Sequence, residues 1–242
     1  MNKHKGFTIV ELLIVIVIIG ILAAISIVTY NGVTQKARES AVKQEAAQTE
    51  RQIMSFAALN GESADKVSGA MVGYQEGLGE SKLLKPLTGT PDITMYMVCT
   101  IKATNSSYSN LSYLKPDNAS SRFALRTGDT GSSSMGSRID TPSQSNRTSF
   151  DPKSIRAVGR TIIGWLQVNN NATVRLSAYN QAASTNNPTD LNPGSGWNFT
   201  EVRAAPSSQC DPKATLVFNT AHDEATRAQV IGWLAQKYDV SL

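Results

Sequence analysis

The first 30 residues, MNKHKGFTIVELLIVIVIIGILAAISIVTY, decide how this protein is built. A short basic head at residues 3–5 ends at Gly6, and the 24 residues 7–30 carry a single charge, Glu11. A helix rises about 1.5 Å per residue, so this segment extends roughly 36 Å, enough to cross the ~30 Å hydrocarbon core of a bilayer. Because backbone groups in lipid must bond one another, a helix is expected despite the many β-branched residues. The basic head predicts a single span with a cytoplasmic N-terminus and the rest of the chain outside.

Glu11 is the unusual residue of this span. A carboxylate inside a membrane helix costs up to ~3 kcal/mol at the centre and less near an end, and it usually marks a function that involves a partner. The alternative is a tolerated charge that snorkels to the interface, since Glu11 follows Phe7 by about one helical turn.

The octapeptide GFTIVELL, residues 6–13, resembles the N-terminal signature of type IV prepilins and pseudopilins, and the resemblance extends over residues 3–25. It implies that a membrane-bound prepilin peptidase cuts after Gly6 and that Phe7 becomes the N-methylated first residue. The apolar run then stays in the mature protein. An ordinary secretory signal would be cut beyond its apolar run, at a small-residue site such as residues 23–24.

The same resemblance implies a role for Glu11 in assembly with other pilin subunits. The carboxylate of an incoming subunit would pair with the Phe7 amine of a neighbour while both lie in lipid. An unpaired charge there is costly, so the pairing is strongly favoured.

The spine helix is predicted to cover residues 7–60. Beyond the membrane a weak apolar stripe continues at helical spacing, and Asn60-Gly61 supplies a stop signal. Its members are Ala37, Ala41, Ile53, Phe56 and Ala57. Residues 61–86 mix apolar residues with several glycines, and this segment is interpreted as a connector with one or two helical turns.

From residue 87 the pattern changes to short apolar or β-branched runs separated by polar loops, which predicts a β-sandwich head over residues 87–242. The expected strands are residues 93–103, 122–126, 157–168, 172–179, 197–203 and 214–218. Residues 128–148 and 180–196 are expected to be loops. A final helix, capped by Thr220 or Asp223, completes an α+β chain. Its predicted apolar stripe is Ala225, Val230, Ile231, Leu234 and Tyr238.

The segment LVFNTAHDEATRAQVIGWLAQKY, residues 216–238, resembles the last strand and helix of concanavalin A-like and laminin-G-like jelly rolls. This second resemblance covers residues 90–242. It departs from the usual pattern in one respect, because the head has too few predicted strands for a complete jelly roll.

Residues that carry chemistry are few. His4 is lost with the leader, and His222 is expected to be solvated or to face a helix dipole. No catalytic, metal-ligand or phosphate-loop spacing appears, so no cofactor and no enzymatic activity are expected. Asp129 and Asp140 flank a loop that could hold Ca²⁺, but such pairs are common in surface loops.

Two further features leave alternatives open. Trp165, Trp197 and Trp233 could line a sugar-binding platform, although their positions favour the core. Cys99 and Cys210 are the only cysteines; they could form a disulfide outside the cell, as in many pilins, or remain buried thiols.

The sequence therefore predicts a membrane-anchored, pilin-like subunit of a surface filament or pseudopilus. Its expected partners are the prepilin peptidase, other pilin subunits, the assembly machinery and the membrane. The net charge of +4 is scattered, so no nucleic-acid partner is expected. The alternative is a surface adhesin that uses a pilin anchor and binds a glycan through its head.

Overall fold

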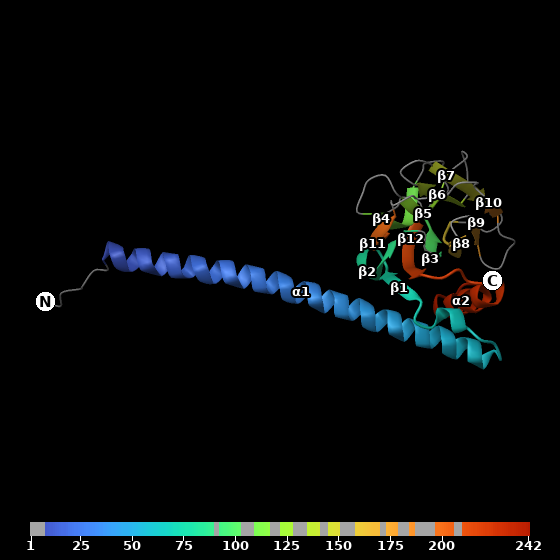
Figure 1. Cartoon of the computed structure of the whole chain (residues 1–242), viewed down its shortest axis with the longest axis horizontal. Helices are drawn as coiled ribbons and strands as arrows, with labels where there is room; N and C mark the ends of the chain where they lie inside the picture. Colours follow the sequence, from blue (N-terminus) through green and yellow to red (C-terminus); the bar gives the residue numbers. More distant parts are fainter. Residues whose placement is uncertain are drawn as a thin grey trace. The chain divides into compact units, whose positions relative to one another are not determined.

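The computed structural model describes residues 8–89, 92–102, 109–116, 122–127, 135–140, 145–150, 158–169, 173–178, 184–186, 197–205 and 210–242. The chain forms two compact units, residues 1–41 and 42–242. Helix α1 (Ile9–Leu59) supplies most of the first unit and the beginning of the second (Figure 1).

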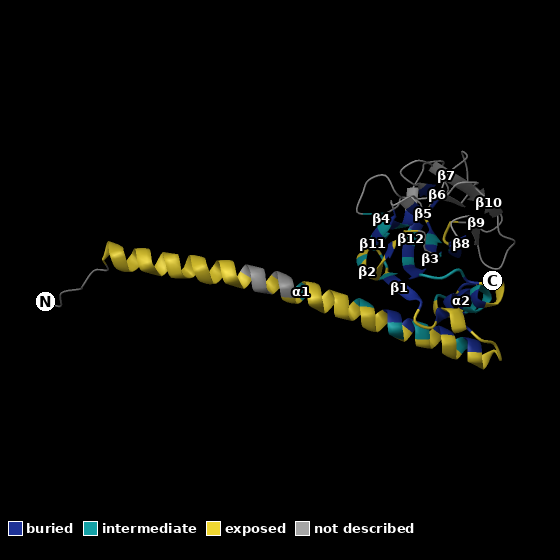
Figure 2. Ribbon diagram, viewed as in Figure 1, coloured by how far each residue is buried: buried dark blue, intermediate teal, exposed yellow. Residues whose placement is uncertain are grey.

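In the first unit the large apolar side chains whose burial the structure describes have no protein cover. Every large apolar residue from Ile9 to Ile25 is between 48% and 83% exposed (Figure 2). The expected helical span is confirmed as a helix, with a window at Ile9–Ser26 long and apolar enough to cross a membrane.

In the second unit the same helix buries a narrow stripe. The buried residues follow one another at helical spacing: Ala46, Thr49, Ile53 and Ala57. The expected members Ala37 and Ala41 are exposed, so this part of the prediction was wrong: burial begins only where the head covers the helix. The helix ends at Leu59 as expected, and Gly61 takes a φ of +72°, which glycine adopts without strain.

The head is a sandwich of two antiparallel sheets, and each sheet has six strands among the described residues. The first sheet has the order β1 (Met71–Glu76), β12 (Cys210–Phe218), β3 (Ile93–Ile101), β8 (Thr161–Asn169), β9 (Thr173–Ala178), β10 (Ser184–Asn186). The second sheet has the order β2 (Gly79–Thr88), β11 (Asn198–Ala204), β4 (Ser109–Pro116), β5 (Arg122–Thr127), β6 (Met135–Asp140), β7 (Ser145–Phe150). A short 3-10 helix, η1 (Asp65–Val67), precedes β1, and α2 (Glu224–Lys237) follows β12.

The six predicted strands are confirmed as β3, β5, β8, β9, β11 and β12. The interpretation of residues 61–86 as a connector was wrong, because β1 and most of β2 lie there. The expected loops 128–148 and 180–196 were also wrong, since they contain β6, the start of β7 and β10. Of the strands missed in those loops, β7 and β10 lie at the ends of their sheets and are rich in serine, threonine and asparagine. Strand β6 lies between β5 and β7, and its sequence MGSRID has only weak apolar alternation.

The main core lies between the two sheets and continues under α2. Nearly all of β3 is buried, because β3 has a neighbouring strand on each edge and packed residues on each face. Val230, Ile231 and Leu234 of α2 are buried as predicted, whereas Ala225 is exposed. Trp233, which the predicted stripe left out, is 6% exposed.

The close approach of β1 to β2 yields a test of the corrected topology. A Cβ atom at Gly73 would lie 2.5 Å from Leu83 Cδ2 and 3.2 Å from Val217 Cβ. We expect Gly73→Ala to lower the free energy of unfolding by about 1–3 kcal/mol through overpacking, measured by denaturant titration with tryptophan fluorescence. In a Leu83→Ala background the added cost should shrink, because the first clash is removed. Equal costs in the two backgrounds would contradict the packing of β1 on β2.

Candidate assembly site

The N-terminus of α1 is closed by a reciprocal pair of contacts between Thr8 and Glu11. Glu11 Oε2 accepts hydrogen bonds from the backbone N of Thr8 at 2.9 Å and from Thr8 Oγ1 at 2.8 Å. In return the Glu11 backbone N donates to Thr8 Oγ1 at 3.3 Å. This is a capping box, in which two groups at the helix start satisfy each other. The unassembled chain therefore holds the Glu11 carboxylate in a fixed position at the end of the apolar span.

Thr8 is the site residue that the sequence analysis missed. The signal was present, since a threonine followed three residues later by a glutamate before an apolar run is the sequence pattern of a capping box. Gly6 and Phe7, the predicted processing residues, lie outside the described residues.

The apolar surface beside this cap is the second part of the site. The 18 residues of the Ile9–Ser26 window have a mean hydropathy of 3.0, and none of them is buried in the structure. Burying apolar surface stabilises a protein by about 25 cal/mol per Å², so a surface of this size is unfavourable in water. It requires lipid or other apolar helices as its surroundings.

The head contacts the second half of α1 through both helices and strands. Phe56 of α1 packs so closely on α2 that a Cβ atom at Gly232 would lie 3.0 Å from its ring. Glu50 Oε1 accepts a hydrogen bond of 2.8 Å from the backbone N of Met71, the first residue of β1. Ile53 between these contacts is fully buried. The head is therefore attached to α1 by apolar packing and by a charge-assisted hydrogen bond.

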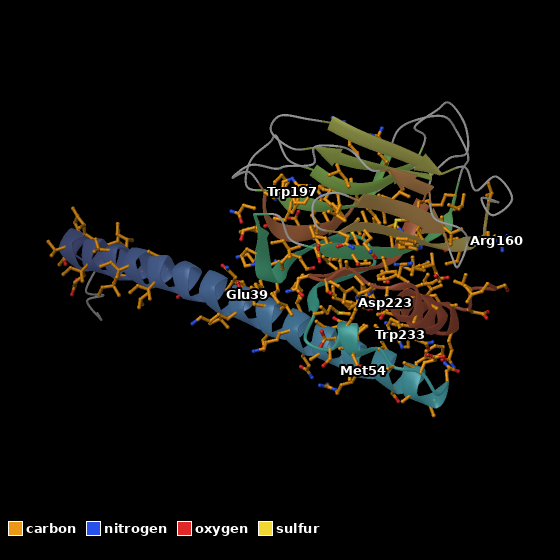
Figure 3. All side chains as sticks on the ribbon, turned by 45° about the vertical axis from the view of Figure 1, so that its right-hand side comes forward. Glu39, Met54, Arg160, Trp197, Asp223 and Trp233 are labelled. Carbon is orange, nitrogen blue, oxygen red and sulfur yellow. A yellow bond between two sulfur atoms is a disulfide. The ribbon has the colours of Figure 1, made fainter. Side chains whose placement is uncertain are left out.

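Helix α2 begins at a strong cap. Asp223 Oδ1 accepts a hydrogen bond of 2.8 Å from the backbone N of Thr226, which confirms one of the two predicted caps. Lys66 of η1 places its Nζ 3.0 Å from Asp223 Oδ2. The bonds from Thr226, with Lys66 adding to them, hold the pKa of Asp223 well below its usual range. Figure 3 shows Asp223 at the start of α2 and Trp233 further along the same helix.

His222, immediately before this cap, is buried, so the solvated alternative predicted for it was wrong. Its side chain is 1% exposed because β3 and β12 cover it. The Nδ1 atom lies 2.8 Å from Tyr96 Oη, and the backbone N donates to Thr94 Oγ1 at 3.1 Å. Burial lowers the pKa of the imidazole to about 3, against the opposing charge of Asp223.

The remaining predicted residues are placed as follows. Trp165, Trp197 and Trp233 are at most 6% exposed, so they serve the core and offer no platform for a sugar. Asp129 lies outside the described residues, and Asp140 ends β6. Among the residues that the structure describes, no group of three or more His, Cys, Asp or Glu side chains could hold a metal ion.

The sulfur atoms of Cys99 and Cys210 are joined at 2.05 Å between β3 and β12.

The burial of His222 predicts how the stability of the head depends on pH. The imidazole of His222 has a pKa of 6.5 in the unfolded chain, and folding lowers this pKa to about 3. Between pH 3 and pH 6.5 the unfolded chain therefore binds a proton at this position more readily than the folded chain does. The contribution of His222 to the free energy of unfolding is fully present above pH 6.5. It falls as the pH drops toward 3, and about 3 kcal/mol is lost by pH 4. We expect His222→Gln to remove that part of the loss, measured as the free energy of unfolding from pH 7 to pH 4. Arg227 and Lys66, the nearby cations, are unchanged in this variant, and identical pH profiles for the two proteins would contradict the prediction.

Comparison with known proteins covers the two ends of the chain separately. Residues 1–27 match the family described as the prokaryotic N-terminal methylation motif. The type IV major alpha-pilin of Moraxella bovis is 51% identical over 47 residues, which are 19% of this chain and 30% of that protein. The type IV major fimbrial protein FimA of Dichelobacter nodosus is 44% identical over 65 residues, 27% of this chain and 40% of that protein. The chain thus spans less than half the length of the relatives it matches.

The head is similar in fold to solved structures of other kinds. The binding domain of botulinum neurotoxin serotype D aligns with a TM-score of 0.51 and 10% identity, over 67% of this chain and 42% of that chain. NanB, in a structure with optactamide, aligns with a TM-score of 0.50 and 11% identity, over 64% of this chain and 27% of that chain. At such identities the likeness shows the fold alone. It confirms the jelly-roll type of head, and the expectation that strands were missing from it was wrong.

The chain therefore combines an N-terminal methylation motif, with sequence similarity to type IV pilins, and a β-sandwich head that is similar in fold to other solved structures.

Proposed function

We propose that this protein is a type IV pilin-like subunit that is anchored in the membrane by residues 7–30 and then assembled into a surface filament or pseudopilus. The observation that carries the proposal is the Glu11 carboxylate, fixed by Thr8 at the end of an apolar helix that has no protein cover. The match of residues 1–27 to the methylation motif and the similarity to type IV pilins support it.

The chemistry of docking follows from this cap. Cleavage after Gly6 would create a free amine at Phe7, a cation about one helical turn away from the Glu11 carboxylate of the same subunit. Within one subunit the Glu11 carboxylate is already satisfied by two Thr8 donors. The cation on a neighbouring subunit adds a charge–charge interaction, which is stronger in lipid than in water. Two subunits would thus be held at a defined axial offset, with their apolar helices side by side.

The head takes no part in this pairing. The head is a β-sandwich, whereas the anchor is a single helix. The head packs on α1 through residues 46–57. A filament built from the anchors would carry the heads outward as separate folded units. The assembly machinery and the prepilin peptidase are the partners that this role requires.

The processing step gives the first prediction of this proposal. We expect protein recovered from the cell surface to begin at Phe7, with an added methyl group on its amine. N-terminal sequencing and intact mass measure both features. A mature protein that begins after Ala23 or Ala24 would instead be an ordinary secreted protein, and the filament proposal would be rejected.

The Glu11 carboxylate gives the second prediction. Glu11→Ala should leave the precursor inserted in the membrane and cleaved after Gly6, but it should leave the neighbour's amine unpaired. An unpaired buried charge costs about 3–5 kcal/mol, so the amount of sheared filament should fall by more than 100-fold. Immunoblots of the membrane and sheared fractions with an antibody to the head measure both pools.

Two variants separate the charge of Glu11 from its capping role. Glu11→Gln keeps an oxygen that can accept from Thr8 but removes the charge, so it should fail to assemble as Glu11→Ala does. Glu62→Gln removes a carboxylate from an exposed position after the end of α1 and should assemble normally. Normal filament yield from Glu11→Gln would mean that the residue acts as a helix cap and not as a partner in docking.

A further inference from the structure

The outer face of the second sheet is assigned by the register of its strands. Leu125 of β5 is 0% exposed and pairs with Ser112 of β4, whose hydroxyl lies 2.7 Å from Thr215 Oγ1 of β12 in the first sheet. This contact crosses the core, so Leu125 and Ser112 face inward. Because side chains alternate along a strand, Ala124 and Arg126 lie on the opposite, outer face of the head.

Three neighbouring strands bring four residues together on this outer face. Ala124 of β5 pairs with Tyr113 of β4 on one side and with Arg138 of β6 on the other. Arg126 pairs with Gly136, so the two arginines are diagonal neighbours and each lies opposite a small residue. The small residues leave the space above them to the long arginine side chains. We call Tyr113, Ala124, Arg126 and Arg138 the arginine patch.

The arginine patch has a buried base and a partly exposed rim. Arg126 is 5% exposed and Ala124 is 0% exposed, whereas Tyr113 and Arg138 are half-buried. Both arginines interact within the chain, but a guanidinium group carries five N–H donors and keeps its charge. The charge of a largely buried guanidinium group is also screened less than that of an exposed one. The arginine patch therefore attracts an anion to its rim.

On the neighbouring strands of the same face, cations and carboxylates are paired. Lys115 Nζ of β4 lies 2.7 Å from Glu201 Oε2 of β11, and Arg203 Nε of β11 lies 3.8 Å from Glu80 Oε2 of β2. These carboxylates neutralise the cations beside them and would repel a long polyanion that lay across the sheet. The arginine patch is thus a short cationic surface, which suits a single anionic group better than an extended phosphate backbone.

From the register, burial and charge of these residues we propose that the arginine patch binds the carboxylate group of an acidic glycan. The guanidinium group of Arg138 matches a carboxylate with two parallel N–H···O bonds. Arg126 adds its charge from beneath, and the flat ring of Tyr113 offers an apolar surface to one face of the sugar ring. Binding takes place on the head and needs no contact between subunits, so it adds a ligand-binding role to the proposed filament subunit.

Binding of small acidic oligosaccharides is the first test. The full chain in detergent micelles is titrated with sialyllactose, with a hyaluronan tetrasaccharide and with lactose in an isothermal calorimeter. We expect saturable binding of at least one acidic oligosaccharide and none of lactose. Conversion of the carboxylate to its methyl ester should lower the affinity by about 10-fold or more, because the charge-assisted hydrogen bonds are lost. Equal binding of acid and ester, or no binding of either acidic oligosaccharide, would overturn the inference.

Variants of the same chain test whether binding occurs at the arginine patch. Arg138→Gln removes the charge and the paired donors, so the affinity should fall by about 10-fold or more. Arg138→Lys keeps the charge without the planar fork and should give an intermediate affinity. The matched control is Arg160→Gln, at a half-buried arginine directly before β8 of the first sheet, which should leave the affinity unchanged. Circular dichroism of each variant shows whether the head is folded, and an unchanged affinity in folded Arg138→Gln would contradict the proposal.

Duplex DNA is the competing ligand, because its phosphates would also be attracted by arginine. The duplex is titrated into the same protein and into Arg138→Gln. We expect any binding of the duplex to be the same for both proteins. Duplex binding that Arg138→Gln abolishes, without binding of the acidic oligosaccharides, would reject the glycan and assign the arginine patch to a phosphate backbone.

Discussion

The packing of the second half of α1 into the head is the contact on which this structure depends. Ala46, Thr49, Ile53 and Ala57 are buried at helical spacing, and Phe56 packs on α2 where only a glycine leaves room for its ring. Helix α2 is fixed in turn by its Asp223 cap and by the contact of Asp223 with Lys66. These contacts pack four segments of the head unit against one another: residues 46–57, η1, β1 and α2. We call this packed set the joint.

The two halves of α1 thus need different surroundings. Residues 9–26 in its first half are apolar apart from Glu11, Gly20 and Ser26, and their surface is stable only among lipid tails or other apolar helices. Its second half is amphipathic and buries one stripe against protein. Under the proposed function the anchor would pass from membrane to filament without refolding of the head, because the exposed apolar residues 9–26 and the head-packed residues 46–57 do not overlap. In the comparisons, residues 1–27 match the methylation motif, whereas the similarity of the head to solved structures is one of fold alone.

The sequence was informative where the physical cause is local. The apolar span, the stop at Asn60-Gly61 and the Asp223 cap each depend on residues within about one helical turn, and each was predicted. The Thr8 partner of Glu11 was equally local and was overlooked. Which helical stripe is buried, and that His222 lies in the core, depend on where distant strands pack. Strands β7 and β10 could not be predicted, because these sheet-end strands are rich in serine and asparagine and carry no apolar alternation. Strand β6, which β5 and β7 flank, was missed because its six residues MGSRID alternate only weakly.

The most direct test of this account compares two fragments of the soluble part of the chain. Residues 42–242 keep the whole joint, whereas residues 87–242 lack the helix, β1 and nearly all of β2. Denaturant unfolding followed by circular dichroism and tryptophan fluorescence should give one cooperative transition for residues 42–242 and none for residues 87–242. A transition of residues 87–242 with the same midpoint and slope would contradict the account, because the sandwich would then be complete without α1 and β1.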